Sequence, residues 1–168
     1  MSLRLDREDL ALLIELLRDA RRSFRRLSSA LGLTTASVIR RVRRLMQQGI
    51  IGGFCAIVDW ERLGFDVTAI IEITVSRGKL LEMEGEIAKM PEVCAVYDVT
   101  GLTDAFVIAK FRNRAELSGF VKRLLSMPFV ERTNTHVVLT CVKEDFRPLE
   151  RLRAMLGERE REQARRSA

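Results

Sequence analysis

The sequence predicts an α+β protein with an N-terminal helix-turn-helix domain of three helices and a C-terminal ferredoxin-like βαββαβ domain. Two observations carry this prediction. Three amphipathic helical segments with capping signals fill residues 1–49, and strand and helix patterns then follow in the order βαββαβ over residues 67–147. Between the two domains, residues 50–66 are expected to form a linker with a strand over 50–59, and residues 148–168 to form a charged C-terminal extension.

The composition excludes several classes of protein. The chain has 168 residues, of which 47% are hydrophobic, and this is enough for a packed core. No apolar run approaches the ~18–20 residues that span a bilayer, and the first residues lack the apolar stretch of a signal peptide. We therefore expect a cytoplasmic protein without a membrane partner. The three cysteines lie far apart and His136 is the only histidine, so we expect no disulfide framework, metal site or cofactor.

The first two helices are predicted from their caps and their apolar spacing. The first begins at Asp6, a favourable N-cap residue. Its apolar residues recur at helical spacing: Leu10, Leu13, Ile14 and Leu17. The second begins at Ser23 and ends at Gly32, which suits a left-handed helix C-cap. Short helices joined by a turn of this kind form a helix-turn-helix unit.

The third helix, from Thr34 or Thr35 to about Gln48, carries the functional argument. At about 100° per residue, one face is apolar: Val38, Val42, Leu45 and Met46. The opposite face is small or polar at its start and cationic behind: Ala36, Ser37, Arg40, Arg43, Arg44 and Gln47. Small side chains let a helix end enter the major groove, where Ser and Arg reach base edges and later Arg residues bind phosphates. The pattern is therefore that of a DNA-recognition helix.

The distribution of charge indicates a polyanionic partner. Nine Arg and a single acid, Asp19, lie between residues 18 and 44. We therefore expect double-stranded DNA as the partner. The expected contacts are Arg26, Thr35, Ser37, Arg40, Arg41 and Arg44. A three-helix bundle used for protein contacts is the alternative, and the Arg-only cationic face disfavours it because such a face needs an acidic partner.

The second domain is predicted from its alternating strands and helices. Strands are expected over 67–76, 93–100, 104–111 and 130–142, and helices over 79–89 and 114–126. One sheet face should meet the helices: Val67, Ala69, Ile71, Ile73 and Val75. The other face is also apolar: Ile70, Val96, Phe106, Ile108 and Val138. Because an apolar face of this kind is expected to be covered, we predict a homodimer with sheets packed face to face, whose two identical DNA-binding domains read two half-sites.

Several motifs resemble those of a known family. The first domain carries Leu5-Asp6-x-x-Asp9, Leu31-Gly32-Leu33-Thr34 and Val38-x-Arg40-Arg41-Val42-x-Arg44-Leu45. The second carries Leu63-Gly64-Phe65-Asp66-Val67-Thr68-Ala69 and Val99-Thr100-Gly101-x-x-Asp104. In this order and spacing the chain resembles the Lrp/AsnC (leucine-responsive, feast/famine) transcriptional regulators over roughly 4–147. The resemblance implies a sequence-specific DNA-binding regulator whose dimers assemble to tetramers or octamers, with amino-acid effectors bound between the second domains of adjacent dimers.

The loop Gly101-Leu102-Thr103-Asp104 departs from the family pattern, which commonly reads Gly-Asp-aromatic-Asp. By resemblance, Gly101 and Asp104 are the expected effector-binding residues, with Asp104 paired to an ammonium group. Leu102 and Thr103 remove one charge and one ring, which predicts weaker binding or a more apolar ligand. A tight turn without a ligand site accounts equally well for Gly and Asp at these positions.

Two further functions compete with a ligand-responsive regulator. A ligand-independent architectural DNA binder of the same fold is favoured by the altered residues 102–103. An enzyme is not expected, because Glu82, Glu84 and Glu86 lie along one helix without a base partner and His136 lies on a strand among Thr and Val.

The C-terminal extension is expected to contain a short amphipathic helix. Its apolar residues are Leu149, Leu152, Met155 and Leu156, directly after Pro148. A frayed, charged tail over residues 158–166 is expected to follow.

Overall fold

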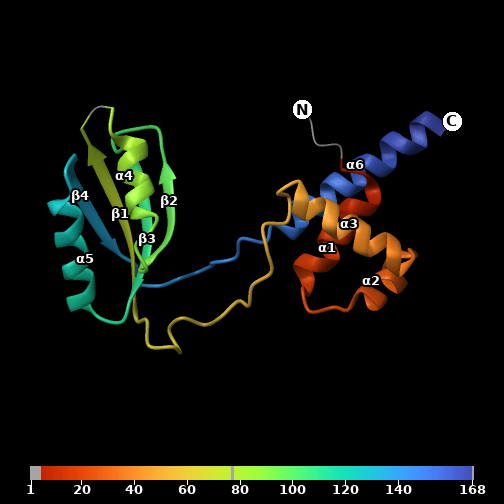
Figure 1. Ribbon diagram of the computed structural model, residues 1–168, viewed down its shortest axis with the longest axis horizontal. Helices are drawn as coiled ribbons and strands as arrows, with labels where there is room; N and C mark the ends of the chain where they lie inside the picture. The colour runs from red at the N-terminus through yellow and green to blue at the C-terminus, as the bar shows by residue number, and fades with distance from the viewer. Residues whose placement is uncertain (1–4, 77, 168) are drawn as a thin grey trace. The chain divides into compact units, whose positions relative to one another are not determined.

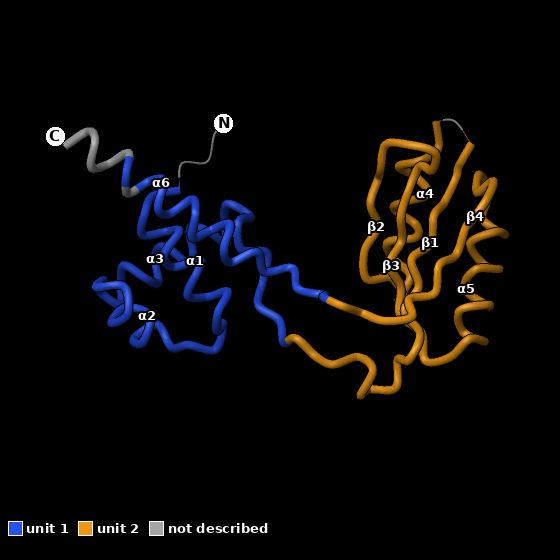
Figure 2. Tube along the Cα trace, turned by 180° about the vertical axis from the view of Figure 1, so that it is seen from behind, with its two compact units in different colours: residues 1–56, 143–168 blue, residues 57–142 orange. Residues whose placement is uncertain are grey.

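A computed structural model of the protein describes residues 5–76 and 78–167, with the side chains at 160 and 162–167 left aside. The chain divides into two compact units (Figures 1 and 2). We call the unit of residues 1–56 and 143–168 the head, and the unit of residues 57–142 the body. The α+β fold class is confirmed, with helices alone in the head and a four-stranded sheet in the body.

The first three helices of the head begin where their caps predict. Helix α1 spans Arg7–Arg18 with Asp6 as N-cap, α2 spans Phe24–Leu31, and α3 spans Thr35–Gln47. The Asp6 side chain accepts from the Asp9 backbone N–H at 2.8 Å, while the Asp9 side chain accepts from the Asp6 N–H at 3.1 Å. This reciprocal pair is a capping box that fixes the start of α1. Gly32, at φ +66°, ends α2 in the left-handed region that favours glycine.

The apolar stripe expected on α1 is divided between two environments. The core of the three-helix bundle takes Leu12, Leu13 and Leu16 from α1. From α2 and α3 it takes Leu27, Val38, Val42 and Leu45. Leu10 and Ile14 are also buried, at 0% and 5% exposed, but lie outside this cluster. The expected stripe does not include Leu12 and Leu16. Both the side of α1 that carries these two residues and the side that carries Leu10 and Ile14 are buried, because a fourth helix also packs against α1.

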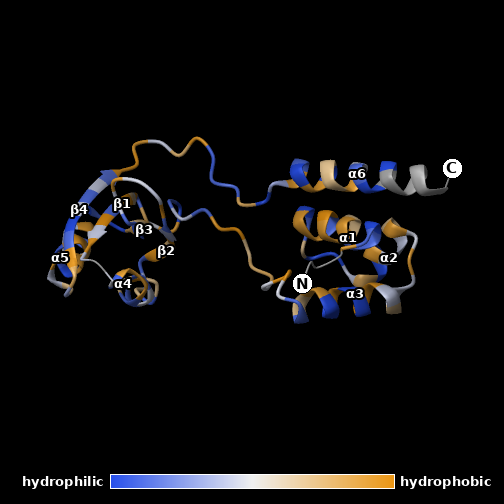
Figure 3. Cartoon of the chain, turned by 90° about the horizontal axis from the view of Figure 1, so that it is seen from above, coloured by the Kyte–Doolittle hydropathy of each residue, from blue (hydrophilic) through white to orange (hydrophobic). Residues whose placement is uncertain are grey.

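That fourth helix is α6, Leu149–Ser167, which belongs to the head and packs against α1 (Figure 3). The expectation of a short helix followed by a frayed tail is wrong, since the helix continues through Ser167. Its last turns are rich in Glu, Arg, Gln and Ala, which have high intrinsic helix propensity and form side-chain pairs along a helix.

The body is a four-stranded antiparallel sheet with strand order β2-β3-β1-β4. Its elements are β1 (Val67–Val75), α4 (Leu80–Ile87), β2 (Val93–Asp98), β3 (Ala105–Phe111), α5 (Arg114–Ser126) and β4 (Val130–Val137). This is the predicted βαββαβ order, and both helices pack against one face of the sheet. The core there joins Ala69, Ile71, Ile73 and Val75 of β1 to Met83 and Ile87 of α4 and to Leu117, Phe120 and Leu124 of α5. We call the opposite face of the sheet the outer face.

Val96 does not lie on the outer face as predicted. The pairing of β2 with β3 shifts register between Val93 and Ala95. A one-residue slip of this kind moves every following side chain to the other face of a sheet. Val96 therefore lies opposite the buried Val107 and packs against the body core, and Ala95 and Tyr97 take the outer face instead.

The strand expected over residues 50–59 is absent from the described structure. Residues 52–59 carry no strand pairing and expose large apolar side chains, among them Phe54, Ile57 and Val58. Alternation alone cannot make a strand, because its backbone groups need a neighbouring strand, and no described segment of the chain supplies one here. The last predicted strand is also too long, since β4 ends at Val137.

Candidate nucleic-acid interface

The side of α3 that faces away from the head core is cationic. Arg40 and Arg43 are exposed, and neither guanidinium has an ion pair or hydrogen bond among the residues that the structure describes. The buried side is formed by Val38, Val42 and Leu45, which have 0%, 4% and 0% of their surface exposed. The helix thus separates an apolar packing face from a face of charges that are free to meet an anion.

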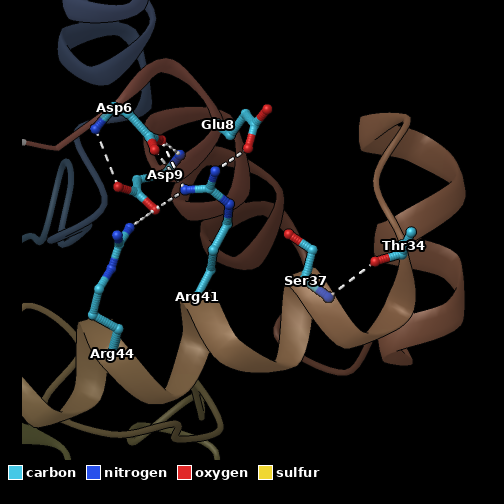
Figure 4. Close-up of polar contacts among 7 residues, drawn as sticks. All are labelled: Asp6, Glu8, Asp9, Thr34, Ser37, Arg41 and Arg44. Carbon is cyan, nitrogen blue, oxygen red and sulfur yellow. Dashed lines mark hydrogen bonds and ion pairs between the residues drawn. The ribbon is translucent and has the colours of Figure 1, made fainter.

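The start of α3 is held by hydroxyl groups. The Thr34 side chain accepts from the Ser37 backbone N–H at 3.1 Å, as an N-cap does (Figure 4). The Thr35 hydroxyl lies 3.2 Å from the hydroxyl of Ser28 on α2. Thr35 therefore joins the two helices of the helix-turn-helix unit through its hydroxyl, although the residue is exposed, and Ser37 is half-exposed.

Arg41 points away from the exposed face and into a cluster of carboxylates on α1 (Figure 4). Its Nη1 donates to Asp9 Oδ1 and to Asp6 Oδ2, each at 2.7 Å, and its Nη2 donates to Glu8. The Arg41 side chain is only 17% exposed and that of Asp9 1%. We call these three carboxylates and Arg41 the acid cluster. The Arg41 guanidinium is bound to these carboxylates within the head, so it is not available to DNA while these contacts last.

Arg44 belongs both to the acid cluster and to the exposed cationic side of α3. Its Nη2 donates to Asp9 Oδ1, yet 45% of its side chain is exposed. One end of the guanidinium therefore supports the acid cluster while the rest faces solvent on the cationic side of α3. Arg26 on α2 is exposed. Its backbone N–H donates to the cap residue Ser23, and its guanidinium has no partner among the described residues.

Within the acid cluster, Asp6 and Arg41 stabilise each other's charged forms. Burial raises the pKa of Asp6, but hydrogen bonds from Arg41 and from the Asp9 backbone, with the charge of Arg41, outweigh it and leave the pKa of Asp6 below its usual value. Burial also lowers the pKa of Arg41, and its hydrogen bonds to Asp6 and Asp9 outweigh that effect and raise it. Both groups are therefore ionised at neutral pH.

The role of Arg41 escaped the sequence reasoning, although a signal was present. Arg41 follows Val38 by three positions and precedes Leu45 by four, which places all three residues near one side of α3. Asp9, whose side chain also accepts from the Asp6 N–H in the capping box, is the buried partner. A lone Arg on an apolar helix face calls for a carboxylate on the helix packed against it.

The loop expected to bind an effector is tied to the end of β1. Asp104 Oδ2 accepts from the Val75 backbone N–H at 2.8 Å, and the Asp104 N–H donates to the Ile73 carbonyl at 3.0 Å. The Thr103 hydroxyl donates to the same carbonyl at 2.8 Å. Gly101 adopts φ +137°, where a side chain is strained, and Leu102 is 99% exposed. One carboxylate oxygen of Asp104 thus has a structural partner within the body. The loop is a turn held to the end of β1 by these three hydrogen bonds.

The outer face of the sheet is apolar in one part and polar in another. Ile70 lies opposite Ile108, and Phe106 lies beside them on β3; all three are half-exposed. Val138 lies just past β4, where its N–H donates to the Thr68 carbonyl at 2.9 Å. Towards β4, His136 Nε2 lies 2.8 Å from Glu72 Oε1.

The described residues offer little for other chemistry. They hold no group of three or more His, Cys, Asp or Glu placed to bind a metal ion. Within the same described part of the chain, no helix combines the length and apolar character needed to cross a membrane.

A helix-turn-helix unit with a cationic outer helix, joined to a separate ferredoxin-like body, defines the class of DNA-binding regulators. Residues 5–46 match the family model for the AsnC-type helix-turn-helix domain, and residues 68–148 match that for the Lrp/AsnC ligand binding domain. The chain belongs to the Lrp/AsnC family of transcriptional regulators. The resemblance inferred from its sequence motifs is therefore confirmed.

Individual proteins agree with this assignment. An uncharacterised HTH-type transcriptional regulator of Pyrococcus furiosus is 46% identical over 143 residues, which cover 85% of this chain and 95% of the relative. The HTH-type transcriptional regulator FL11 of Pyrococcus horikoshii is 36% identical over 86% of this chain and 95% of its own length. A transcriptional regulator of Neisseria meningitidis, solved as an L-Met complex, superposes with a TM-score of 0.79 at 27% identity, covering 89% of this chain and 99% of that one.

Proposed function

We propose that this regulator binds its DNA sites through the exposed side of α3, with Arg40, Arg43 and Ser37 towards the bases and the adjacent phosphates. Arg26 on α2 and the exposed part of Arg44 would contact the flanking backbone. We leave Arg41 out of this interface because its guanidinium binds carboxylates of the head, and Thr35 because its hydroxyl is paired with that of Ser28. We further propose that the protein acts in the cytoplasm, and we propose no catalytic activity for it.

The observation that supports this interface most is the free guanidinium of Arg40. It is exposed on α3, opposite Val38 and Val42, and has no partner among the described residues. A charged side chain held on a rigid helix without an internal partner contacts an anion without first breaking an ion pair. Arg is also the side chain best suited to bidentate contacts with guanine or phosphate.

The test is a titration of duplex DNA, selected from a random pool by the full-length protein, with Arg40→Ala. We expect this change to weaken binding by about 1–3 kcal/mol. Lys122→Ala is the matched control, since it removes one exposed positive charge from α5 in the body. Equal affinities of the Arg40→Ala and Lys122→Ala proteins would rule out the interface.

We also propose that a small amino acid regulates the protein by binding at the loop of residues 101–104. The free oxygen of Asp104 would pair with the ligand ammonium group, and the glycine at 101 would admit the ligand close to the backbone. The L-Met complex of the Neisseria relative supports a ligand of this class. An exposed ion pair is worth at most about 1 kcal/mol, so a useful site needs the partial burial that contact between two bodies supplies.

The proposed assembly is a homodimer through the outer face of the sheet, with higher assembly to tetramers or octamers. Ile70, Phe106 and Ile108 form an apolar area that a second copy would cover. Differential affinity of the ligand for two assembly states is what would convert binding into regulation.

A ligand-independent architectural DNA binder is the second candidate. Its support is the hydrogen bond from the Val75 N–H to Asp104, which gives that carboxylate a structural role without any ligand. Thermal shift across the amino acids separates the two candidates, because the architectural protein is stabilised by none of them.

A further inference from the structure

Helix α1 carries a second apolar stripe that the three-helix bundle does not use. Leu10 and Ile14 are 0% and 5% exposed, yet neither belongs to the head core formed with α2 and α3. At about 100° per residue, Leu10, Ile14 and Leu17 lie on one side of α1. Helix α6 packs against α1 within the head, and Figure 3 shows it on the far side of α1 from α3. The second stripe is therefore buried by α6.

Helix α6 is built to cover such a stripe. Leu149, Leu152 and Leu156 recur at positions i, i+3 and i+7, and each is half-buried. The residues between them, among them Arg151 and Ala154, are exposed. The helix lies outside the matched family domains, because the match to the ligand binding domain ends at residue 148 and α6 begins at Leu149. It is thus an addition to the two family domains, docked on the one that binds DNA.

The docking of α6 gives the head a second covalent link to the body. The first link leaves the head after the buried Ile51 and reaches β1 at Val67. The second runs from the end of β4 at Val137 to α6 at Leu149. A domain on one flexible link can rotate about it, whereas a second link fixed to another element of the same domain limits that rotation and shortens the reach of the domain.

We propose that α6 clamps the DNA-binding head to the body through this second link, and that the clamp narrows the range of half-site spacings that the protein accepts on DNA. The proposal rests on the proposed DNA-binding interface and dimer. A dimer whose heads swing freely adapts to half-sites at several separations, while restrained heads meet only those near one geometry. Because α6 and α3 lie on different sides of α1, the clamp acts without touching DNA.

The experiment compares three variants of the full chain. Leu152→Asp places a charge in the α6–α1 contact, and Ala154→Asp places the same charge on the exposed side of α6. Insertion of about twelve Gly/Ser residues between Thr140 and Cys141 lengthens the second link while leaving α6 intact. The probes are a duplex selected from a random pool by the wild-type protein, and versions whose half-sites are moved apart by about five or about ten base pairs.

On the duplex whose half-sites are moved apart by about five base pairs, or half a helical turn, we expect the wild type and Ala154→Asp to lose at least about tenfold in affinity. On the same duplex, Leu152→Asp and the insertion variant should lose less than about threefold. Amide hydrogen exchange across Leu10–Leu17 should accelerate in Leu152→Asp and stay unchanged in the insertion variant. This exchange measurement reports the docking of α6 on α1 in the absence of DNA, and it also shows whether the head remains folded.

Two results would overturn the inference: exchange in α1 that Leu152→Asp leaves unchanged, or an insertion variant as selective for spacing as the wild type. Failure of the proposed function has a different signature. In that case the wild-type protein itself selects no duplex from the pool, whatever the exchange measurement says of α6.

Discussion

Arg41 of helix α3 donates to the buried carboxylate of Asp9 on α1 at 2.7 Å. The contact joins residues 32 positions apart and, with Asp6 and Glu8, sets α3 against the start of α1. The acidic side chains lie at the N-terminus of α1, where the helix dipole also favours negative charge. The Arg residues of α3 thus serve two purposes, with Arg41 holding the helix and Arg40 presented outwards.

Replacing Arg41 should destabilise the head. Arg41→Ala removes the hydrogen bonds that Arg41 donates to Asp6, Glu8 and Asp9, and it leaves the buried Asp9 with Arg44 and the Asp6 backbone N–H as partners. We expect a loss of about 1.5–3 kcal/mol in the free energy of unfolding of the head, the usual worth of hydrogen bonds to charged groups. Urea unfolding followed by the methyl NMR signals of Leu27 and Leu45 in the head core provides the measurement.

Arg40→Ala is the control for this prediction, because it removes a neighbouring Arg without an internal partner. Its effect on stability should stay within about 0.5 kcal/mol, as for most surface substitutions. The structural assignment of Arg41 fails if the two variants unfold at the same urea concentration.

The local features of the head and body were predictable from the sequence because local chemistry determines them. Asp6, Ser23 and Thr34 each satisfy the free N–H groups of the helix that follows, whatever the rest of the chain does. Alternation along 67–75 likewise reports burial of one sheet face directly. These signals placed the helices of the head and the order of elements in the body.

The features that escaped prediction depend on neighbours distant in sequence. The position of Val96 depends on a register shift near Cys94, which no alternation pattern reveals. The partner of Arg41 and the docking of α6 are choices made by tertiary packing. The absence of a strand over 50–59 has the same cause, since strand formation requires a pairing partner as well as a suitable sequence.

The acid cluster also predicts how the head responds to acid. Hydrogen bonds from Arg41 and from the Asp9 backbone outweigh the effect of burial and hold the pKa of Asp6 below its ordinary value of 3.8. A carboxyl whose pKa is lower in the folded state stabilises that state fully above the unfolded pKa, and this contribution is lost as the pH falls through the folded pKa. The head should therefore keep constant stability from this group between about pH 5 and 7 and lose it below about pH 4.

The comparison for acid stability is Arg41→Met, which removes the guanidinium but keeps an unbranched side chain. Its unfolding free energy, measured by urea titration between about pH 3 and 7, should fall less steeply in acid than that of the wild type. Equal acid slopes in the two proteins would show that Arg41 does not depress the pKa of Asp6.

Disruption of the outer face should dissociate the protein. Ile108 lies opposite Ile70 on that face, so Ile108→Glu places a charge in the apolar area of each copy. Loss of two buried Ile side chains per dimer costs at least about 3 kcal/mol, or about 100-fold in dimer Kd. Light scattering on the full chain should show a smaller mass for Ile108→Glu.

Ser118→Glu is the control for the dimer prediction, because it adds the same charge to the exposed surface of α5, away from the outer face. Its mass should equal that of the wild type. A wild type that scatters as a monomer, or an Ile108→Glu protein of unchanged mass, would refute the dimer through this face.

The final prediction separates the two roles of Asp104. Its carboxylate accepts from the Val75 N–H, so Asp104→Ala removes a structural hydrogen bond together with the charge. Asp104→Asn retains an oxygen acceptor for that N–H and removes only the charge. Without ligand, we expect Asp104→Asn to match the wild-type melting temperature closely and Asp104→Ala to melt lower, because it leaves a backbone donor unpaired.

With ligand, the order of the variants should change. A small apolar amino acid should raise the melting temperature of the wild type as its concentration exceeds Kd, since binding to the folded state alone stabilises by mass action. Asp104→Asn should lose this response although its unliganded stability is intact, because a neutral amide cannot replace a carboxylate as the partner of an ammonium group. A response in Asp104→Asn equal to that of the wild type would leave Asp104 with its structural role only, and would place the ligand elsewhere on the body.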